Sequence, residues 1–501
     1  MIYQTDVAKA IIEAGANTAV SERRFLELEI ARWKKSPVRK TMLDGERYHN
    51  GDHDILQRKR KAIGRDGKLQ EVDNLPNNRI VDNQYAKMVE QKVNYILGKP
   101  LTIETKNKTY LEALKKIFNK KMHRKLKRLA ENCIDGGIAW LYPYYAADGT
   151  LAFRVFPGYE ILPFWKDAEH TELDYAVRLY EVEAYEGETL KIIEKVEVYK
   201  PTGIERYILQ NGSLIDDVEN PSSAYLIIED EEGNVSGLNW ERIPLIPFKY
   251  NNKEQPLLKR VKTLQDGINT MLSDFENNMQ EDSRNTILVI KNYDGTNLGE
   301  FRHNLATYGA VKVKTVDGAD GGVDTLEVKV NADNYKAIVE IFKKALIENA
   351  MGYDAKDDKL SGNPNQMNIL SMYSDIELDA NGIETEFQAS FEELLWFINT
   401  HLANTGVGDF FDEEVTFTFD RTILMNESEA IMNCKNSVGI LSDETIIGEH
   451  PWVTDVAQEL ERIRKQRESE MDEYQNLFGK KPNDDPDDGG DDQSPGGDQA
   501  E

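Results

Sequence analysis

The sequence contains few cysteines, since Cys133 and Cys434 are the only two among 501 residues. They lie far apart and form no CxxC motif, which argues against a disulfide framework and favours a reducing compartment. Long apolar runs are also missing, because no uncharged segment approaches the ~18 residues that a membrane span needs. Residues 1–20 lack the basic region of a signal peptide. We therefore expect neither a membrane span nor a secretory signal.

Positive charge is scarce as well. The chain has 61 Lys and Arg against 89 Asp and Glu, a net charge of −28. Residues 468–501 alone hold 12 acids and 2 lysines, and the stretch 476–501 is rich in Asp, Gly and Pro, so we expect it to be disordered. A chain this acidic is not expected to be a simple nucleic-acid binder, which would show a basic face.

The motifs of common enzymes are absent: there is no GxxxxGK[ST], GxGxxG, HExxH or GxSxG. The strongest metal-like cluster joins His49, Asp52, His53 and Asp54 within six residues. These residue types can bind a divalent ion, but no further ligands follow at metal-site spacing. The favoured interpretation is a polar turn after a helix, and the alternative is a metal-dependent nuclease. We expect no catalytic residue, metal or cofactor.

Two further features admit a catalytic or binding interpretation. The acid pairs 281–282 and 357–358 resemble acid/base or two-metal sites, yet 89 acids produce such pairs by composition. The run KKIFNKKMHRKLKRL (115–129) holds nine basic residues, counting His123, and could contact nucleic acid. Its apolar residues recur at helical spacing, which favours a solvated helix with one apolar face. The role of this basic run stays open.

Periodicity divides the chain into helical and strand-rich regions. Residues 1–135 are predicted to be mostly helical, with helices at 22–33, from an N-cap at Asp82 to Gly98, and at 109–132. Residues 136–250 have the pattern of a meandering antiparallel domain of five to seven strands, with turns at Asp148-Gly149 and Asn211-Gly212.

The second half of the sequence alternates long helices with short strands. The predicted order is helix 257–279, strand 285–295, strand–turn–strand 309–330, helix 332–350, loop 351–366, helix 367–402, strand 415–424 and helices within 426–470. A loop of this length between two strong helices is uncommon inside a domain and is often functional. Gly382 lies within the longest helix and could mark a bend there.

Several segments occur together, in a fixed order and at fixed spacings. They are NNRIVDNQYAKMVEQKVNYILGKP (77–100), IPLIPFKYNN (243–252), LVIKNYDGTNLGEFRHNL (288–305), GGVDTLEVKV (321–330), TFTFDRTILMNESE (416–429) and LSDETIIGEHPWVTDVAQELERI (441–463). Near the last segment, the matching positions are Gly439, Ser442, Glu444, Pro451, Asp455 and Glu459. On these segments the chain, from about residue 20 to 470, resembles the portal proteins of tailed bacteriophages, of the type found in long-tailed phages of Gram-positive hosts.

The resemblance implies a mixed α+β, multidomain portal fold, with long helices that line the channel of a ring. Its parts would be a wing (1–253, helical to about 135 and β-rich over 136–250), a stem helix (254–282), a clip (283–331), a second stem helix (332–350), a tunnel loop (351–366), a long helix and strand that return to the wing (367–424), a crown (425–475) and a disordered acidic tail (476–501).

The resemblance also implies a function. Portal proteins form a ring, usually of twelve subunits, at one capsid vertex of the virion, and are assembled in the host cytoplasm. The ring is the conduit for double-stranded DNA, and it docks the terminase large subunit, a head-completion adaptor, and the major capsid and scaffolding proteins. The tunnel loop would present Lys356, Lys359, Asn363 and Asn365 to the DNA. The clip would use Lys291, Tyr293, Asp294, Glu300 and Arg302 for docking.

Two alternatives belong to other classes. One is the metal-dependent nuclease built on the histidine and aspartate cluster. The other is a different acidic head protein, such as a minor capsid or scaffolding component. Scaffolding proteins are usually long, helical and poor in core residues, so the β-rich pattern of 136–250 argues against the second alternative.

Overall fold

A computed structural model describes most of the chain. The described residues are 21–63, 68–73, 75–146, 148–229, 235–282, 286–291, 314, 318, 321–327, 331–354, 366–421, 427–453 and 456–478. Contacts divide the chain into two units, one of residues 1–356 and 371–423 and one of residues 357–370 and 424–501. Each unit is described separately below.

The N-terminal helices of the first unit begin at polar caps. Helix α2 (Glu22–Lys34) and helix α3 (Pro37–His49) start after Ser21 and Ser36, whose side chains accept backbone N–H bonds. Helix α4 (Gln84–Leu97) is capped by Asn83, so the predicted N-cap at Asp82 is wrong by one residue. The Asp82 carboxylate instead accepts from Gln84 and pairs with Lys343.

The helix predicted at 109–132 is two helices, α5 (Lys108–Ile117) and α6 (Lys120–Gly136). Asn119 causes the break, because its Oδ1 accepts from the backbone N–H groups of Lys121 and Met122 and so starts a new helix. Phe118, between the helices, packs its ring against Phe391 and Phe417. Short polar residues that compete for backbone N–H groups are easily missed inside a long periodic pattern.

The β-rich region is larger than predicted, with ten strands in three sheets among the described residues of 138–249. A five-stranded antiparallel sheet has the order β10-β9-β8-β7-β6 and a three-stranded sheet the order β13-β4-β5, while β11 and β12 pair alone. The bounds are β4 (Ile138–Tyr145), β5 (Leu151–Pro157), β6 (Ile161–Trp165), β7 (Leu173–Glu186), β8 (Thr189–Lys200), β9 (Gly203–Gln210), β10 (Ser213–Asp216), β11 (Leu226–Glu229), β12 (Val235–Leu238) and β13 (Ile246–Lys249).

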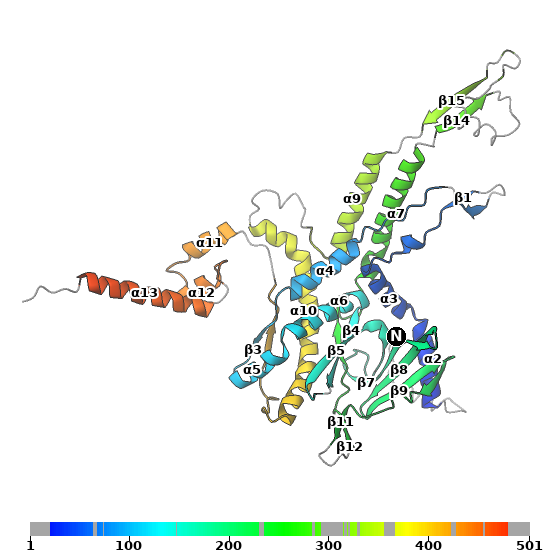
Figure 1. Cartoon of the computed structure of the whole chain (residues 1–501). Coiled ribbons are helices and arrows are strands. Elements are labelled where there is room, and N and C mark those ends of the chain that lie inside the picture. The colour runs from blue at the N-terminus through cyan, green and yellow to red at the C-terminus, as the bar shows by residue number, and fades with distance from the viewer. Residues whose placement is uncertain are drawn as a thin grey trace, which may run out of the picture. The chain divides into compact units, whose positions relative to one another are not determined.

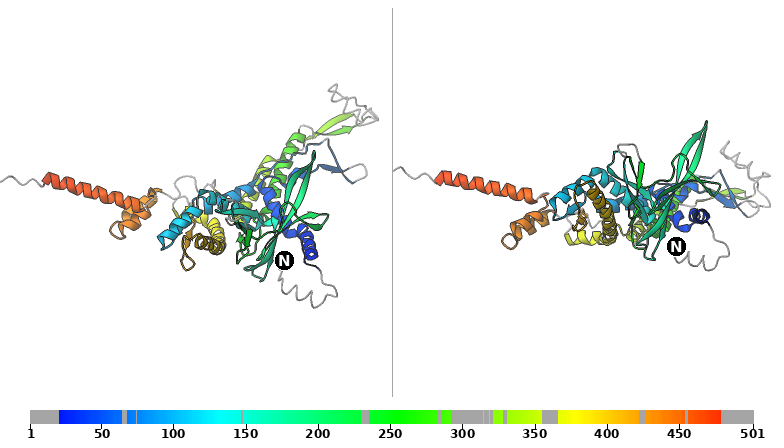
Figure 2. Two further views of the ribbon diagram at one scale, coloured as in Figure 1. Left: turned by 60° about the horizontal axis from the view of Figure 1, so that its bottom comes forward. Right: turned by 90° about the horizontal axis from the view of Figure 1, so that it is seen from below.

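The two faces of the five-stranded sheet have different partners. Val177 and Leu179 of β7 belong to a core with Leu26 and Ile30 of α2, and Figure 2 shows this blue helix beside the sheet. Ala176, on the opposite face of the same strand, belongs to a second core that includes residues of the three-stranded sheet. The five-stranded sheet is therefore the middle layer of this region.

Long helices and short two-stranded sheets complete the first unit (Figure 1). The helices are α7 (Leu258–Asp282), α9 (Ala332–Asn349) and most of α10 (Gln366–Asn404). The strands pair as β1 (Lys61–Ile63) with β2 (Leu69–Glu71), β14 (Thr286–Lys291) with β15 (Gly322–Glu327), and β16 (Thr416–Thr418) with β3 (Thr102–Glu104). The strand predicted at 415–424 is thus only three residues long within the described part. Helix α10 continues through Gly382 without a break in its helical assignment.

The second unit contains helices α11 (Glu427–Asn436), α12 (Asp443–Gly448) and α13 (Val456–Phe478). Ser442 caps α12, since its Oγ accepts from the N–H of Thr445. The predicted break at Gly448–Pro451 is confirmed, because α12 ends at Gly448. Within the part of the chain that the structure describes, no helix is long and apolar enough to cross a membrane.

Candidate functional site

Helices α7 and α9 pack side by side, and the hairpin of β14 and β15 lies between them in the sequence (Figure 1). A Cβ atom on Gly267 of α7 would lie 3.0 Å from the ring of Phe342, so glycine permits the close approach of α9. The rings of Phe275 and Tyr335 are 5.2 Å apart, and Asn278 Nδ2 donates to the Tyr335 hydroxyl (2.8 Å). These contacts hold the two helices together along much of their length.

The predicted apolar stripe of α7 is only partly covered. Val261 and Ile268 are fully buried, whereas Met279 is 50% exposed. On α9, Ile341 is 62% exposed. The apolar residues of the two helices are therefore not all used within the single chain.

A second stripe of α7 is polar and fully buried, which the sequence analysis missed. Its side chains accept hydrogen bonds from backbone N–H groups in the segment before α4 and in the first turn of α4. Asn277 Oδ1 accepts from the N–H of Asn78 (2.7 Å), Ser273 Oγ from Ile80 (2.9 Å), Asn269 Oδ1 from Asp82 (3.0 Å) and Gln265 Oε1 from Tyr85 (2.9 Å). We call this row of four α7 side chains, at i, i+4, i+8 and i+12, the polar ladder.

The spacing of the polar ladder has a geometric cause. Four helical residues rise about 6.0 Å, and two residues of extended chain rise about 6.6 Å. Alternate N–H groups at 78, 80 and 82 therefore meet successive turns of α7. The ladder satisfies backbone groups that no sheet or helix covers, and it joins the irregular segment 76–83 to the middle of α7.

The C-terminal end of α9 is fixed by a buried ion pair. Lys92 of α4 donates from Nζ to Asp379 Oδ2 of α10 (2.7 Å) and to the carbonyl oxygen of Met351 (3.0 Å). The Tyr250 hydroxyl donates to the same carboxylate (2.9 Å). Burial lowers the pKa of Lys92, and the charge of Asp379 opposes that shift. Burial also raises the pKa of Tyr250 well above its usual value.

The next two residues are held as firmly. Gln91 Nε2 donates to the carbonyl of Tyr353 (2.9 Å), and Gln91 Oε1 accepts from the N–H of Tyr353 (3.1 Å). A Cβ atom on Gly352 would lie 2.6 Å from Met88 Sδ, so the backbone lies directly against α4. The ring of Tyr353 packs on that of Tyr373 with centroids 4.5 Å apart. We call the contacts of residues 351–353 with α4 and α10 the loop clamp.

The predicted loop 351–366 therefore leaves α9 from a rigid starting point. Residues 355–365 lie outside the described residues, and so do all four predicted DNA-facing side chains, Lys356, Lys359, Asn363 and Asn365. Nothing in the structure tests those four assignments.

Most of the predicted docking residues of the clip also lie outside the described part, namely Tyr293, Asp294, Glu300 and Arg302. Lys291 is described. It is exposed and ends β14, opposite Gly322 of β15.

The two histidines of the metal-like cluster near residue 50 bond other groups of the protein. His49 Nδ1 bonds Asp135 Oδ2 (2.6 Å). His53 is fully buried, and its two ring nitrogens bond the Tyr48 carbonyl (3.0 Å) and Asn269 Nδ2 of the polar ladder (2.8 Å). Since the amide of Asn269 donates to Nδ1, the neutral ring carries its proton on Nε2. Burial lowers the pKa of His53, which favours this neutral form.

Asp54 likewise has partners within the protein. It pairs with Arg47 (2.6 Å) and Lys262, which hold the pKa of its carboxyl well below the usual range despite partial burial. No group of three or more potential metal ligands is present among the described residues. These contacts fit the polar-turn interpretation, since His49, His53 and Asp54 each bond other groups of the protein.

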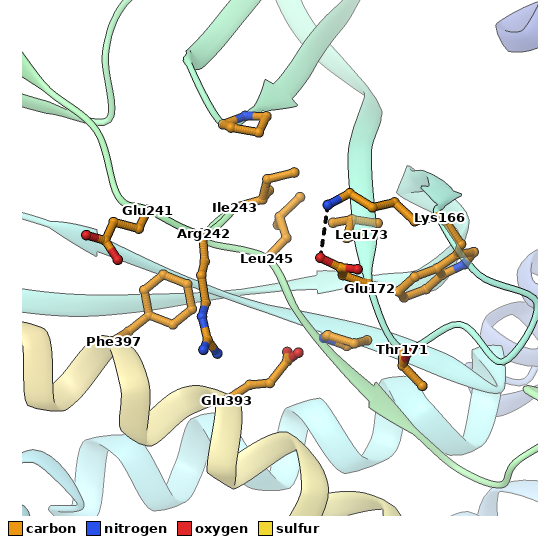
Figure 3. Close-up of a pocket in the computed structure, with 13 residues that line it drawn as sticks. Lys166, Thr171, Glu172, Leu173, Glu241, Arg242, Ile243, Leu245, Glu393 and Phe397 are labelled. Carbon is orange, nitrogen blue, oxygen red and sulfur yellow. Dashed lines mark hydrogen bonds and ion pairs between the residues drawn. The ribbon is translucent and has the colours of Figure 1, made fainter. Parts of the chain in front are cut away.

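A pocket of about 370 Å³ lies between the β-rich region and α10 (Figure 3). Lys166 and Glu172 form an ion pair in its wall (2.9 Å). Glu393 of α10 faces Arg242, and burial raises the pKa of Glu393 although Arg242 opposes that shift. These groups are mixed in charge and include no arrangement of nucleophile and base, so the pocket does not define an active site.

Residues 35–473 match the family described as "Phage portal protein, SPP1 Gp6-like". The match covers most of the chain, which therefore belongs to this family of phage portal proteins. As a member, it is a capsid-associated protein of the virion that acts as an oligomeric ring.

Individual relatives agree with the family assignment. The chain is 29% identical over 483 residues to the portal protein of Bacillus phage SPP1, with 95% of this chain and 92% of that protein covered. It is 26% identical over 460 residues to the portal protein of Clostridium phage phiCD119, with 88% and 96% covered. Both phages infect Gram-positive hosts, as the sequence resemblance suggests. A chain from the virion of a native gene transfer agent particle matches at 11% identity and a TM-score of 0.36, covering 72% of this chain and 87% of that chain.

Proposed function

We propose that twelve copies of this chain close into a ring at one capsid vertex and that double-stranded DNA passes through it during packaging and ejection. The loop clamp carries this proposal. Its buried Lys92–Asp379 pair and the Gln91 contacts define where the loop 351–366 begins, directly after α9. A loop that must contact moving DNA at a fixed height in a channel needs such an anchor at its base.

The helix pair is the proposed stem of the ring. Exposed Met279 and Ile341 on α7 and α9 would pack against neighbouring copies, as expected for heterologous contacts that close into a ring. Residues 283–331 would form the clip, 351–366 the tunnel loop and 425–475 the crown. The helices and sheets before 254, together with residues 367–424, would form the wing.

The charge of the chain suits a conduit. Each copy carries −28, so the ring as a whole repels the DNA polyanion and does not hold it tightly. Lys356, Lys359, Asn363 and Asn365 of the tunnel loop would soften this repulsion at the narrowest point. Such contacts are with phosphates and carry no sequence preference.

The proposed partners are assembly proteins. The clip, through Lys291, Tyr293, Asp294, Glu300 and Arg302, would dock the terminase large subunit during packaging and the head-completion adaptor afterwards. The outer surface would meet the major capsid and scaffolding proteins. We propose no catalytic activity, and no cofactor, for the chain itself.

Imaging of the purified protein tests the proposal. Negative-stain micrographs should show rings with a central hole, and the mass should be about 690 kDa, twelve times the 57.2 kDa chain. A protein that stays monomeric at all concentrations would contradict it. Divalent-metal-dependent DNA cleavage that is lost in His53→Ala would instead revive the nuclease alternative.

A further inference from the structure

Residues 84–136, which contain α4, α5 and α6, have a charge opposite to that of the whole chain. They include thirteen Lys and Arg against five Asp and Glu, a net of +8, whereas the complete chain carries −28. Helices α5 and α6 follow each other in the sequence and are both cyan in Figure 1. The basic run noted in the sequence lies on these two helices.

The basic side chains of this segment lack acidic partners. Of the thirteen, Lys92 alone lies within 4.0 Å of a carboxylate among the described residues. Lys127 donates to the amide oxygen of Asn94 (2.7 Å), and Lys125 donates to the carbonyl of Phe153, so neither of these contacts is an ion pair. A structural role in salt bridges therefore does not explain the accumulation of cations here.

On helix α6, the buried apolar residues and the exposed cations lie on different faces. Met122, Leu126 and Leu129 are buried on one face. The other face carries Lys120, Lys121, Arg124 and Arg128, all exposed, and no acid occurs before Glu131. Lys115 and Lys116, in the last turn of α5, are also exposed. The exposed surface of these two helices is therefore strongly positive, with Glu112 of α5 as its one exposed acid.

This distribution works against the stability of α6. Its cations crowd the N-terminal half, where the helix dipole favours negative charge, and the pairs Lys120–Arg124 and Arg124–Arg128 place like charges at i, i+4. Helix α2 shows the favourable pattern, with Glu22 in its first turn and basic residues in its last. A local arrangement that opposes stability points to a binding role.

The surface also lacks the features of a protein-binding site or a single-strand site. Among the described residues, no large apolar side chain between Leu69 and Val182 is exposed, so the face offers no apolar anchor for a protein partner. Phe118 packs against Phe391 and Phe417 and is not free to stack on a base. A regular polyanion that needs neither anchors nor stacking is the phosphate backbone of a duplex.

We propose that this surface binds the phosphate backbone of double-stranded DNA without sequence preference, at a place distinct from the tunnel loop. We call it the α5–α6 basic face: Lys115, Lys116, Lys120, Lys121, Arg124 and Arg128. The choice of duplex DNA as the polyanion rests on the proposed function. The rest of the chain is acidic, so we expect binding at the basic face alone. Its distant acids do not cancel the attraction, because charges more than about 10 Å apart are screened at 0.1 M salt.

Matched lysine variants of the full-length protein test the inference. The test variant is Lys116→Gln/Lys120→Gln/Lys121→Gln. The control is Lys35→Gln/Lys40→Gln/Lys253→Gln, which removes three exposed lysines without carboxylate partners elsewhere and gives the same net charge. Affinity for a 30-base-pair duplex of random sequence is measured between 50 and 200 mM salt, with ring formation and thermal stability measured in parallel.

The wild type and the control should bind the duplex, with affinity that falls steeply as salt rises. The test variant should bind about tenfold or more weakly at 50 mM salt, and its slope of log affinity against log salt should be smaller by roughly 2 to 3. Its rings and thermal stability should be unchanged or improved. Equal loss in both variants, no loss in either, no duplex binding by the wild type, or a loss of rings in the test variant would each overturn the inference. Since ring formation is scored separately, failure of the basic face is distinguishable from failure of the proposed function.

Discussion

Gln91 and Tyr353 are joined by two hydrogen bonds, in which the side-chain amide of Gln91 binds both backbone polar groups of Tyr353 (2.9 and 3.1 Å). The side-chain amide therefore donates and accepts one hydrogen bond each, as the backbone of a neighbouring strand would. The backbone at Tyr353 is thereby held in a fixed direction, although Tyr353 itself belongs to no strand.

Gly352 and Gly382 should respond to alanine with opposite signs. At Gly352 a Cβ would lie 2.6 Å from Met88 Sδ and 3.0 Å from Gln91 Oε1, so Gly352→Ala must displace the loop clamp. We expect a loss of about 1–3 kcal/mol in the free energy of unfolding. Gly382, inside α10, has no atom within 4 Å of its Cβ position, and Gly382→Ala should gain up to about 1 kcal/mol from helix propensity. Urea titration measures both, and a neutral Gly352→Ala would show that the clamp is loose.

Ser273 and Ser374 provide a matched test of the polar ladder. Ser273 is fully buried, accepts from the N–H of Ile80 and donates to the carbonyl of Asn269. Ser273→Ala leaves that N–H unpaired and should cost about 1–3 kcal/mol in the free energy of unfolding. Ser374 is exposed and bonds only within its own helix, so Ser374→Ala should change stability by less than about 0.5 kcal/mol. Equal effects in a chemical denaturation series would mean that water replaces the ladder.

Glu254 predicts a pH dependence. It is mostly buried, and although burial raises its pKa, His170 (2.7 Å) and Lys249 (3.2 Å) outweigh that effect and leave the pKa lowered. A depressed carboxyl pKa means that the folded state binds fewer protons than the unfolded state, so the contribution is present above the unfolded value of ~4.3 and is lost as pH falls through the folded pKa.

Stability measured from pH 7 to pH 3 should therefore separate the wild type from Glu254→Gln. The wild type should be the more stable at neutral pH, and the difference should shrink below about pH 4.3. Glu172→Gln is the control, since Glu172 is exposed and its pair with Lys166 lies at the surface. A constant difference across the range would argue that Glu254 acts through packing alone.

Removal of residues 354–363 tests the tunnel loop. The loop clamp at 351–353 stays intact, so rings should still form with unchanged mass. DNA packaging or retention should fall, because the proposed contact between the loop and the DNA is then removed. Heads that fill normally with the shortened protein would show that the loop is not a channel element.

Sequence periodicity located the helices well, because α7, α9 and α10 each bury an apolar stripe that recurs at helical spacing. The region 136–250 was harder. Its strands were visible, but their division into separate sheets depends on pairings such as β13 with β4, more than 90 residues apart in the chain. Such long-range pairing leaves no local signal.

The loop clamp and the polar ladder could not be predicted for a related reason. Lys92 had the pattern of an ordinary surface lysine of α4, since its partner Asp379 lies almost 290 residues later. The ladder is visible in the sequence, because Gln265, Asn269, Ser273 and Asn277 recur every four residues. A polar stripe on a helix normally faces solvent. This one is buried, and its side chains bond backbone N–H groups of residues 78–85. For the histidine cluster, spacing in the sequence could not show the partners, because Asp135 and Asn269 lie 86 and 216 residues away from His49 and His53.

The polar ladder has a mechanical consequence. Its four backbone partners meet α7 at nearly equal intervals, so a shift of the helix along its own axis would lengthen all the bonds together instead of one after another. Bonds that lengthen together share an applied force. Bonds that open one after another each bear the whole force in turn. Helix α7 is thus stiff against axial load at its middle. If α7 is a stem helix, as proposed, this stiffness would let it transmit an axial force between the clip and the wing.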